Sequence, residues 1–428
     1  MRLGGRLAAA IEILDDIDRR YRPAADALRD WGLSHRFAGS KDRAAIGNIV
    51  YDALRRKRSA GWIFQEETPR ALAFGALLLQ GECTPDMLNA ALAEDSFAPP
   101  PLSSDEIARI ADHPLDAAPD GVRAESPEWC EPLLKRTWGD DWVAEAAALS
   151  ERPPLDMRTN TLRATRDQVA KALASAGALP CDLAPQGLRV PAIEGQGRHP
   201  NVQSEQAFRD GWFEVQDEGS QIVAELTDAT SGMQVLDFCA GAGGKSLAMS
   251  AAMGNTGQIH AFDADRKRLA PIIDRLKRAG CRNVQAVADE AALAPFEGRL
   301  DLVVVDAPCT GAGTWRRRPD AKWRLGEKQL EQRQAEQAEI LAKAARFVRP
   351  GGRLAYITCS VFAEENEDQV RAFIEANPAF RPVDHEALWE RHFPGKAARA
   401  KIDRATGIAL SPHRTATDGF HFAALERV

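Results

Sequence analysis

The chain has 428 residues, more than one ordinary domain needs and enough for two or three. Hydrophobic residues make up 44% and charged residues 27%, which is typical of a globular protein. The net charge of −7 argues against a protein that coats nucleic acid non-specifically. A sum over the whole chain does not exclude a local basic groove.

Cysteine usage and hydropathy narrow the class further. The seven cysteines include no CxxC pair and no cluster with histidine at zinc spacing, so we expect no metal site. Their odd number and scattered placement favour a reducing cytoplasm. The N-terminus starts like a signal peptide, but Glu12, Asp15 and Asp16 interrupt its apolar run too early. No stretch of about 18 apolar residues occurs, so no membrane-spanning helix is expected.

Residues 1–95 predict a small helical domain, because apolar residues recur at helical spacing from Leu7 to Ile17. Further helices are expected at 41–62 and 69–80. A segment rich in proline, aspartate and glycine follows at 96–121, and we interpret it as a linker. Helices resume at 127–137 and 140–150.

Residues 122–228 predict a small α+β module, since short apolar runs alternate with turns around one helix at 166–176. Strands are expected at 155–160 and 187–190. The size suits an RNA-recognition-like sheet, although no aromatic run of the kind that stacks RNA bases is present.

From 229 to 428 the pattern is regular. Strands are expected at 234–238, 258–262, 284–288, 300–305 and 353–357, with a last one at 418–425. Helices are expected between them, at 246–252, 266–279, 327–348 and 365–376. Strands that alternate with helices predict an α/β fold with a doubly wound, mostly parallel sheet.

A glycine-rich turn, Cys239-Ala-Gly-Ala-Gly-Gly-Lys-Ser246, joins the first of these strands to a helix. Glycine lets a ligand approach the backbone closely. A phosphate-binding P-loop is the obvious alternative, because Gly244-Lys245-Ser246 matches its end. That motif needs another glycine where this chain has Cys239, so we exclude it.

Two acidic residues follow the next two strands. Asp263 is placed to accept hydrogen bonds from ribose hydroxyls, and Asp289 to accept one from an adenine amino group. The alternative for Asp263 is a cap on the helix predicted from Arg266. A ligand with ribose and adenine but no phosphate fits the whole pattern, and S-adenosylmethionine fits better than a dinucleotide.

Two further strands each stop at a thiol, one at Cys309 in Asp306-Ala-Pro-Cys309 and the other at Cys359 in Ile357-Thr-Cys359. Strand ends of an open α/β sheet face the ligand crevice, so the two thiols are expected to meet over one substrate. A thiolate attacks electron-poor ring carbons, which suggests covalent chemistry on a pyrimidine. Methyltransferases acting on amino nitrogens would have Pro-Pro-Tyr after the aspartate, which this chain lacks.

Taken together, these segments resemble the RNA cytosine-5 methyltransferases of the Sun/Fmu (RsmB, NOP2/Sun) family, from about residue 122 to 428. The most specific matches are 306–313, Tyr356-Ile-Thr-Cys-Ser-Val-Phe-Ala-Glu-Glu-Asn366 and Leu410-Ser-Pro-His-Arg-Thr-Ala-Thr-Asp-Gly-Phe420, supported by Val215-Gln-Asp-Glu-Gly-Ser-Gln221 and Met157-Arg-Thr-Asn160. Ala242 departs from the family, which often has proline there. The N-terminal helices are more loosely similar to the NusB-like domain of bacterial members.

The resemblance implies roles for individual residues. Cys359 is then the nucleophile that adds to C6 of cytosine, Asp306 binds the base near N3, and Cys309 assists release of the product. DNA cytosine-5 enzymes use the Pro-Cys thiol instead, and the residues alone do not choose between the two. The cofactor site is expected to comprise Cys239, Ala240, Gly241, Ala242, Gly243, Gly244, Lys245, Asp263, Asp289 and Asp306.

RNA is the expected partner, with no membrane, metal or protein partner implied. The residues expected to contact it are Arg316, Arg317, Arg318, Lys322, Arg158, Asn160, His413 and Arg414. For the arginine run, a solvated surface segment is the alternative. Ribosomal RNA is the favoured substrate; transfer RNA, or a catalytically silent RNA-binding assembly factor, are the alternatives.

Overall fold

The computed structural model describes residues 1–81, 83–193, 195 and 197–428. The chain forms two compact units. The helical unit comprises Met1–Arg152, Ile193–Arg198 and Trp315–Leu325, and the sheet unit comprises Pro153–Ala192, His199–Thr314 and Gly326–Val428. This division differs from the expected one, because the helical unit extends past the predicted linker and takes in a later segment.

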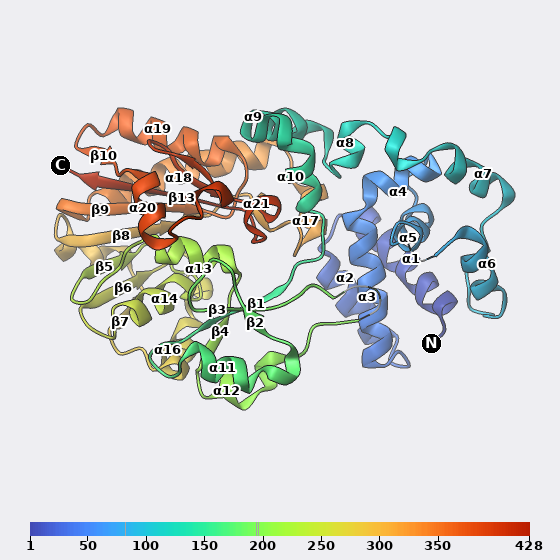
Figure 1. Ribbon diagram of the computed structural model, residues 1–428, viewed down its shortest axis with the longest axis horizontal. Helices are drawn as coiled ribbons and strands as arrows, with labels where there is room; N and C mark the ends of the chain where they lie inside the picture. Colours follow the sequence, from blue (N-terminus) through green and yellow to red (C-terminus); the bar gives the residue numbers. More distant parts are fainter. Residues whose placement is uncertain (82, 194, 196) are drawn as a thin grey trace. The chain divides into compact units, whose positions relative to one another are not determined.

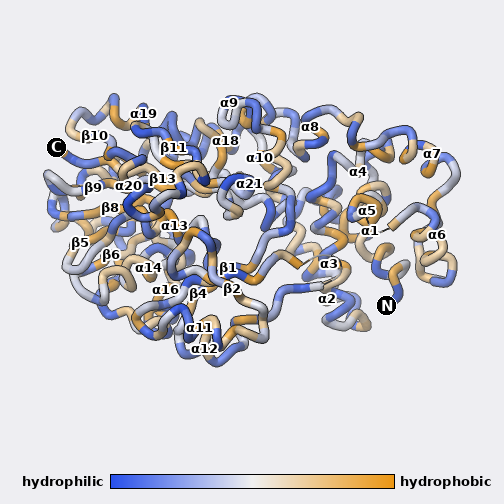
Figure 2. Tube along the Cα trace, viewed as in Figure 1, coloured by the Kyte–Doolittle hydropathy of each residue, from blue (hydrophilic) through white to orange (hydrophobic). Residues whose placement is uncertain are grey.

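The helical unit is built around amphipathic helices whose apolar faces, such as Leu7 and Ile13 on the first of them, meet in one core. Figure 2 shows hydrophobic residues along α1, α3 and α5. Its α-helices are α1 (Leu3–Arg20), α2 (Ala24–Ser34), α3 (Ser40–Arg55), α4 (Lys57–Phe64), α5 (Pro69–Leu78), α6 (Pro85–Ala93), α7 (Ser104–Asp112), α8 (Asp120–Arg123), α9 (Glu131–Trp138), α10 (Trp142–Ala148) and α17 (Pro319–Arg324).

The segment 96–121, expected to be a linker, is part of the packed helical unit. It contains α7, which starts with a capping box in which Ser103 and Glu106 satisfy each other's backbone N–H groups. Arg70 of α5 pairs with Glu106 at 3.0 Å and donates to the carbonyls of Pro100 and Pro101. The proline-rich run is therefore held by side-chain contacts that composition alone does not reveal.

The sheet unit begins with a small antiparallel sheet in the order β2-β3-β1-β4. Met157, Val169 and Phe213 lie in its core. The expected α+β module is therefore present, with two strands that the sequence did not indicate. Its elements are β1 (Leu155–Thr159), α11 (Arg166–Ala172), β2 (Leu179–Pro180), β3 (Gly187–Val190), α12 (Gln206–Arg209) and β4 (Phe213–Val215).

The main sheet has nine strands, in the order β11-β12-β13-β9-β8-β5-β6-β7, with β10 paired to β13. Its strands are β5 (Gln234–Asp237), β6 (Gln258–Phe262), β7 (Val284–Val287), β8 (Leu300–Asp306), β9 (Val348–Thr358), β10 (Phe380–Pro382), β11 (Lys401–Asp403), β12 (Gly407–Leu410) and β13 (Phe420–Arg427). From β7 to β9 the pairing is parallel, and from β9 outward it is antiparallel. The doubly wound parallel core is confirmed, and an antiparallel edge extends it.

Helices cover both faces of this sheet (Figure 1). They are α13 (Glu218–Glu225), α14 (Gly244–Ala252), α15 (Arg266–Leu269), α16 (Ile272–Ala279), α18 (Glu327–Ala345), α19 (Glu367–Ala376), α20 (His385–His392) and α21 (Pro412–Thr415). Successive strand residues alternate between two cores: Val304 packs on the side of α13 and α14, and Val303 on the side of α18. The helix expected at 266–279 is split, because Pro271 begins a new helix.

This topology decides where a ligand can bind. Strand order reverses between β5 and β8, since β6 and β7 lie on one side of β5, and β8 and β9 on the other. In doubly wound sheets the crevice at such a switch point, beyond the carboxyl ends of the strands, holds the ligand.

Candidate active site

The two strand-end thiols meet. Strands β8 and β9 are parallel neighbours, with Asp306 opposite Ile357 in the register. The turns that leave them bring the Sγ atoms of Cys309 and Cys359 to 3.3 Å from each other. The expectation that both thiols face one place is confirmed, and both are free thiols in this structure.

Cys309 lies in a buried environment. A hydrogen bond with Cys359 and burial both raise the pKa of Cys309 well above its usual value, and the nearby negative charge of Glu365 adds to the shift. At 3.3 Å, a protonated thiol on either residue can donate to the sulfur atom of the other.

A buried carboxyl group fastens the turn that carries Cys309. Glu365, fully buried in the 3-10 turn η8 (Ala363–Glu365), accepts hydrogen bonds from the backbone N–H of Thr310 at 2.8 Å and from its hydroxyl at 2.5 Å. The side-chain amide of Gln337 donates to the same carboxyl at 2.9 Å and to the carbonyl of Pro308 at 3.0 Å. Glu365 and Gln337 thus hold the residues on both sides of Cys309, and we call this pair the clasp.

The turn after Cys359 is fixed in a similar way. Asn366 bonds the hydroxyl of Thr358 at 2.5 Å and donates to the carbonyl of Ser360 at 3.1 Å. The carbonyl of Cys359 accepts from the N–H of Gly313 at 2.9 Å. Gly313 in turn crosses Gly419 so closely that a Cβ added at Gly313 would lie 2.0 Å from the Gly419 carbonyl oxygen. Segments far apart in the sequence therefore position one sulfur atom.

Asp306 lies at the end of β8, directly before this turn. The Nζ atom of Lys245 is 3.1 Å from Asp306 Oδ2, and also donates to Ser220 Oγ at 2.8 Å. The side chain of Lys245 is 6% exposed, whereas that of Asp306 is 32% exposed. The carboxylate of Asp306 is therefore partly accessible to a substrate, while the buried ammonium group of Lys245 binds its Oδ2 atom.

The glycine-rich turn joins β5 to α14, as expected. Gly241 and Gly243 have φ values of +50° and +84°, where a side chain would strain the backbone. A Cβ added at Gly243 would also lie 2.5 Å from Ile272 Cγ1. Asp263, at the end of β6, accepts a hydrogen bond from the N–H of Gly241 at 2.9 Å, so the glycine-rich turn and this carboxylate lie side by side.

The acids expected at the ribose and adenine positions lie at the ends of adjacent strands. Asp263 does not cap the following helix: Asp265 does so, by accepting from the N–H of Lys267. Asp263 accepts two backbone N–H groups, and a carboxylate has capacity for further donors. Asp289 is exposed and accepts from the N–H of Ala291. These residues fit a nucleoside with a free ribose.

The sequence interpretation missed Asp237. It ends β5 below the glycine turn, is fully buried, and accepts from the Ser246 hydroxyl at 2.7 Å. Its Oδ1 has no hydrogen-bond partner among the described residues. Burial raises its pKa to about 7. A buried acceptor without a hydrogen-bond partner fits a site for a ligand with a polar donor group. The sequence feature that could have revealed Asp237 is its position as a carboxyl group at the end of a strand.

Two residues expected to contact RNA are packing residues instead. Asn160 is buried, and its amide donates to the carbonyls of Gly211 and Ala279 at 2.8 Å each, so it joins the small sheet to the end of α16. Arg158 is 6% exposed and donates to Gln216 Oε1 at 2.7 Å. Burial lowers the pKa of Arg158 to about 10. Neither side chain is displayed to a phosphate backbone.

The basic segment after the Cys309 turn belongs to the helical unit. Lys322 is 1% exposed and donates to the Glu125 carbonyl at 2.7 Å and to Ser150 Oγ at 2.6 Å. It is therefore a packing residue rather than an RNA contact. In the preceding run, Arg316 is buried, Arg317 is half-buried and Arg318 is exposed. Nearby, Trp323 Nε1 donates to the carbonyl of Leu54 at 2.7 Å.

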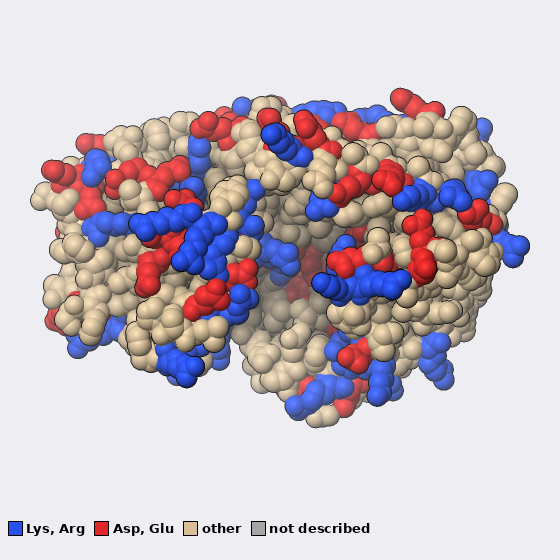
Figure 3. Space-filling model, turned by 180° about the vertical axis from the view of Figure 1, so that it is seen from behind, with Lys and Arg blue, Asp and Glu red and all other residues tan. Residues whose placement is uncertain are grey.

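His413 is exposed and Arg414 is half-buried on α21. On the face shown in Figure 3, basic and acidic side chains are interspersed.

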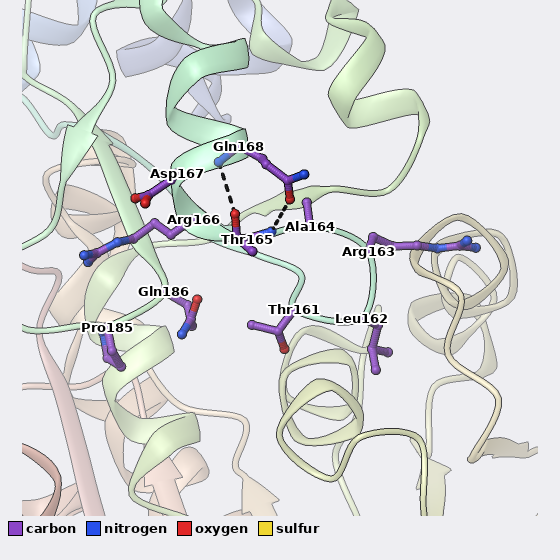
Figure 4. A pocket seen from close by; sticks show the side chains of 10 residues that line it. All are labelled: Thr161, Leu162, Arg163, Ala164, Thr165, Arg166, Asp167, Gln168, Pro185 and Gln186. Carbon is purple, nitrogen blue, oxygen red and sulfur yellow. Dashed lines mark hydrogen bonds between the residues drawn. The ribbon is translucent and has the colours of Figure 1, made fainter.

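A hollow of about 590 Å³ lies in the small-sheet module (Figure 4). The start of α11 lines this hollow, and Thr165 and Gln168 form a capping box there. Arg163 and Arg166 also line it. None of the residues predicted for catalysis or cofactor binding lies in its wall, so it is separate from the thiol site.

Within the described part of the chain, no cluster of histidine, cysteine and acidic side chains is placed to hold a metal ion. Among those residues, too, no helix has the length and hydrophobicity needed to cross a membrane.

A doubly wound sheet with a glycine turn after its first strand and acids after the next two defines the class of S-adenosylmethionine-dependent methyltransferases. Comparisons with known proteins agree. The family model "16S rRNA methyltransferase RsmB/F" matches residues 224–426, and the ferredoxin-like domain of RsmF/B-like methyltransferases matches residues 126–192.

Curated relatives are similar over most of the chain. A "Ribosomal RNA small subunit methyltransferase B" from Pseudomonas syringae pv. tomato is 30% identical over 72% of this chain and 67% of its own length. One from Salmonella typhi is 33% identical over 70% and 66%, and a probable one from Synechocystis is 29% identical over 72% and 68%. The chain belongs to the RsmB/F family of ribosomal RNA methyltransferases, whose cofactor is S-adenosylmethionine.

Solved structures support the fold. The crystal structure of PH0851 has a TM-score of 0.72 at 26% identity, with all of both chains covered. NSun6 from Pyrococcus horikoshii with SFG has a TM-score of 0.61 at 21% identity, over 71% of this chain and 98% of that one, and it supports the fold alone.

Proposed function

We propose that this protein transfers the methyl group of S-adenosylmethionine to C5 of a cytosine in ribosomal RNA, and that it does so through a covalent intermediate with Cys359. One observation carries the proposal: two thiols stand 3.3 Å apart, one in the turn after β8, which ends in Asp306, and the other directly after β9. A methyltransferase acting on an oxygen or nitrogen has no need of a thiol nucleophile, whereas C5 of cytosine is unreactive until a nucleophile adds at C6.

The chemistry then divides among the chain's own residues. The Cys359 thiolate forms a bond to C6, and the displaced electron pair makes C5 nucleophilic. Asp306 hydrogen-bonds the base near N3, and a proton that it donates to N3 offsets the negative charge that the attack at C6 places on the ring. Once C5 carries the methyl group, a solvent water takes its proton, and the electrons of that C–H bond form the C5=C6 double bond. The bond between C6 and Cys359 breaks, its electron pair returns to Cys359 as a thiolate, and the aromatic ring is restored. The bound cofactor supplies the electrophilic methyl group on its sulfonium.

The family resemblance assigns Cys359 as the nucleophile and Cys309 as the helper. At 3.3 Å, a protonated Cys309 can donate to the Cys359 sulfur and stabilise the thiolate, both before attack and as it leaves. The target base must leave its stack to reach a thiol held in the turns at the sheet edge. The names of the curated relatives support ribosomal RNA of the small subunit as the substrate.

Bisulfite sequencing of ribosomal and transfer RNA from a strain that lacks the gene tests this proposal. We expect one or a few 5-methylcytosines to disappear from small-subunit ribosomal RNA, and to return with the wild-type gene but not with Cys359→Ala. Unchanged methylation contradicts the proposal. A loss confined to transfer RNA keeps the chemistry and reassigns the substrate.

A further inference from the structure

A chain of hydrogen bonds runs from the small sheet to the aspartate of the reaction site. It starts at Arg158 on β1, whose Nε donates to Gln216 Oε1 at 2.7 Å. The amide of Gln216 donates to Ser220 Oγ at 3.1 Å. Lys245 Nζ then donates to the same Ser220 oxygen at 2.8 Å and to Asp306 Oδ2 at 3.1 Å. Every link lies within the sheet unit.

Ser220 is the link that fixes the lysine. A hydroxyl oxygen has two lone pairs, and here both accept hydrogen bonds, one from Gln216 and one from Lys245. The Lys245 ammonium also lies 5.3 Å from the centre of the Phe420 ring, within the range of a cation–π contact. Three neighbours therefore define the position of Nζ, and among them the side chain of Asp306 is 32% exposed.

An ordinary structural role for the Ser220 hydroxyl would be a helix cap, since this residue lies in the first turn of α13. Asp217 already fills that role, because its carboxyl accepts from the N–H of Gly219. The serine hydroxyl points instead to the lysine. Gln216 is itself fixed, because its backbone N–H donates to the Asp156 carbonyl at 3.0 Å next to the small sheet.

We propose that Ser220, supported by Gln216, is a positioning residue for methyl transfer: it holds Lys245 against one oxygen of Asp306 and so presents the other oxygen to the base in a fixed orientation. This inference rests on the proposed function, in which Asp306 binds the cytosine ring. Without the serine oxygen, the ammonium group of Lys245 loses one of its hydrogen-bond partners, and the flexible lysine side chain can move away from Asp306. The carboxyl group then samples orientations that do not match the reacting base.

Single-turnover methylation of ribosomal RNA by the full chain tests the inference. Ser220→Ala should lower the rate at saturating RNA by about 10- to 100-fold, as expected when a reacting group is misplaced by a fraction of an ångström to 1 Å. The KM for RNA and the dissociation constant for S-adenosylmethionine should stay within about threefold of wild type, because Ser220 touches neither ligand in this account. Ser220→Thr, which keeps the hydroxyl oxygen, should restore most of the rate.

Ser231→Ala is the matched control, since this exposed serine bonds Thr256 and lies away from the network. A wild-type rate for Ser220→Ala overturns the inference, and so does a failure of Ser220→Thr to rescue. Thermal denaturation identifies a variant that has merely lost its fold. In that case Gln216→Ala, which removes the outer support of Ser220 and the acceptor of Arg158, must show the same selective loss of rate or the inference fails. If wild-type protein forms no 5-methylcytosine at all, the proposed function fails first.

Discussion

Replacing Glu365 should loosen the turn that carries Cys309 and also change how that thiol titrates. The carboxyl group of Glu365 is fully buried and receives three hydrogen bonds, two from Thr310 and one from Gln337. It also contributes to the raised pKa of Cys309. Glu365→Ala removes both effects. Glu365→Gln removes the charge but keeps an oxygen that accepts the Thr310 N–H.

The magnitude follows from the donors that are left without an acceptor. A buried donor deprived of its partner costs about 1 to 3 kcal/mol, and water entering the space left by the side chain offsets part of this. For the three donors to Glu365, we expect Glu365→Ala to cost about 3 to 4 kcal/mol in local stability. That corresponds to an increase of about 100- to 1,000-fold in the equilibrium population of the open turn, whereas Glu365→Gln should cost only about 1 kcal/mol.

Hydrogen exchange of the Thr310 amide measures this opening directly, because that N–H is bonded to the carboxyl group. Protection should fall sharply in Glu365→Ala and little in Glu365→Gln. The pKa of the Cys309 thiol, followed by its reactivity with a small alkylating agent in a Cys359→Ser background, should fall in both variants. Unchanged protection of Thr310 in Glu365→Ala would refute the clasp, and an unchanged thiol pKa in Glu365→Gln would refute the electrostatic part.

Three further predictions concern separate features. Gly313→Ala should abolish methylation, because its Cβ would collide with the Gly419 carbonyl, whereas Gly39→Ala, where a Cβ meets nothing within 4 Å, should leave activity intact. Burial lowers the pKa of His421 from 6.5 to about 4. The folded state therefore has the full stability contribution of neutral His421 above pH 6.5, and it should lose about 3 kcal/mol of that stability as the pH falls towards 4. Denaturant titrations at both pH values should show a smaller loss for His421→Gln. Asp263→Ala should weaken binding of S-adenosylmethionine in calorimetry by about tenfold or more, through loss of a ribose contact, and unchanged affinity would remove Asp263 from the cofactor site.

The parallel core and the thiol pair were predictable because strand periodicity and strand ends are local signals. Val303 to Val305 form a continuous apolar run buried on both faces, which predicts a central strand and places the residue after it at the crevice. The short strand β10 was missed, since it is held by pairing with β13 at the end of the chain. The strands β11 and β12 were missed because they form a local hairpin whose strands are too short to show an alternating pattern.

Side-chain roles were harder to predict from the sequence than positions. Lys322 and Asn160 were interpreted as RNA contacts because of their charge and their motifs, yet burial decides their role, and burial depends on tertiary packing. Glu365 and Ser220 lay inside motifs that the resemblance had already singled out. For Gln337 no sequence signal exists, because a glutamine in a polar helix looks like a surface residue.

The identity of the nucleophile is the central claim, and trapping of the covalent intermediate tests it most directly. Cys309→Ala protein, incubated with ribosomal RNA and S-adenosylmethionine, should accumulate an RNA adduct that survives detergent and maps to the peptide containing Cys359. Cys359→Ala should form none, and Cys281→Ala, at a cysteine outside the pair, should behave as wild type. An adduct in Cys359→Ala, or its absence in Cys309→Ala that still binds RNA and cofactor, would contradict the assignment of the two thiols.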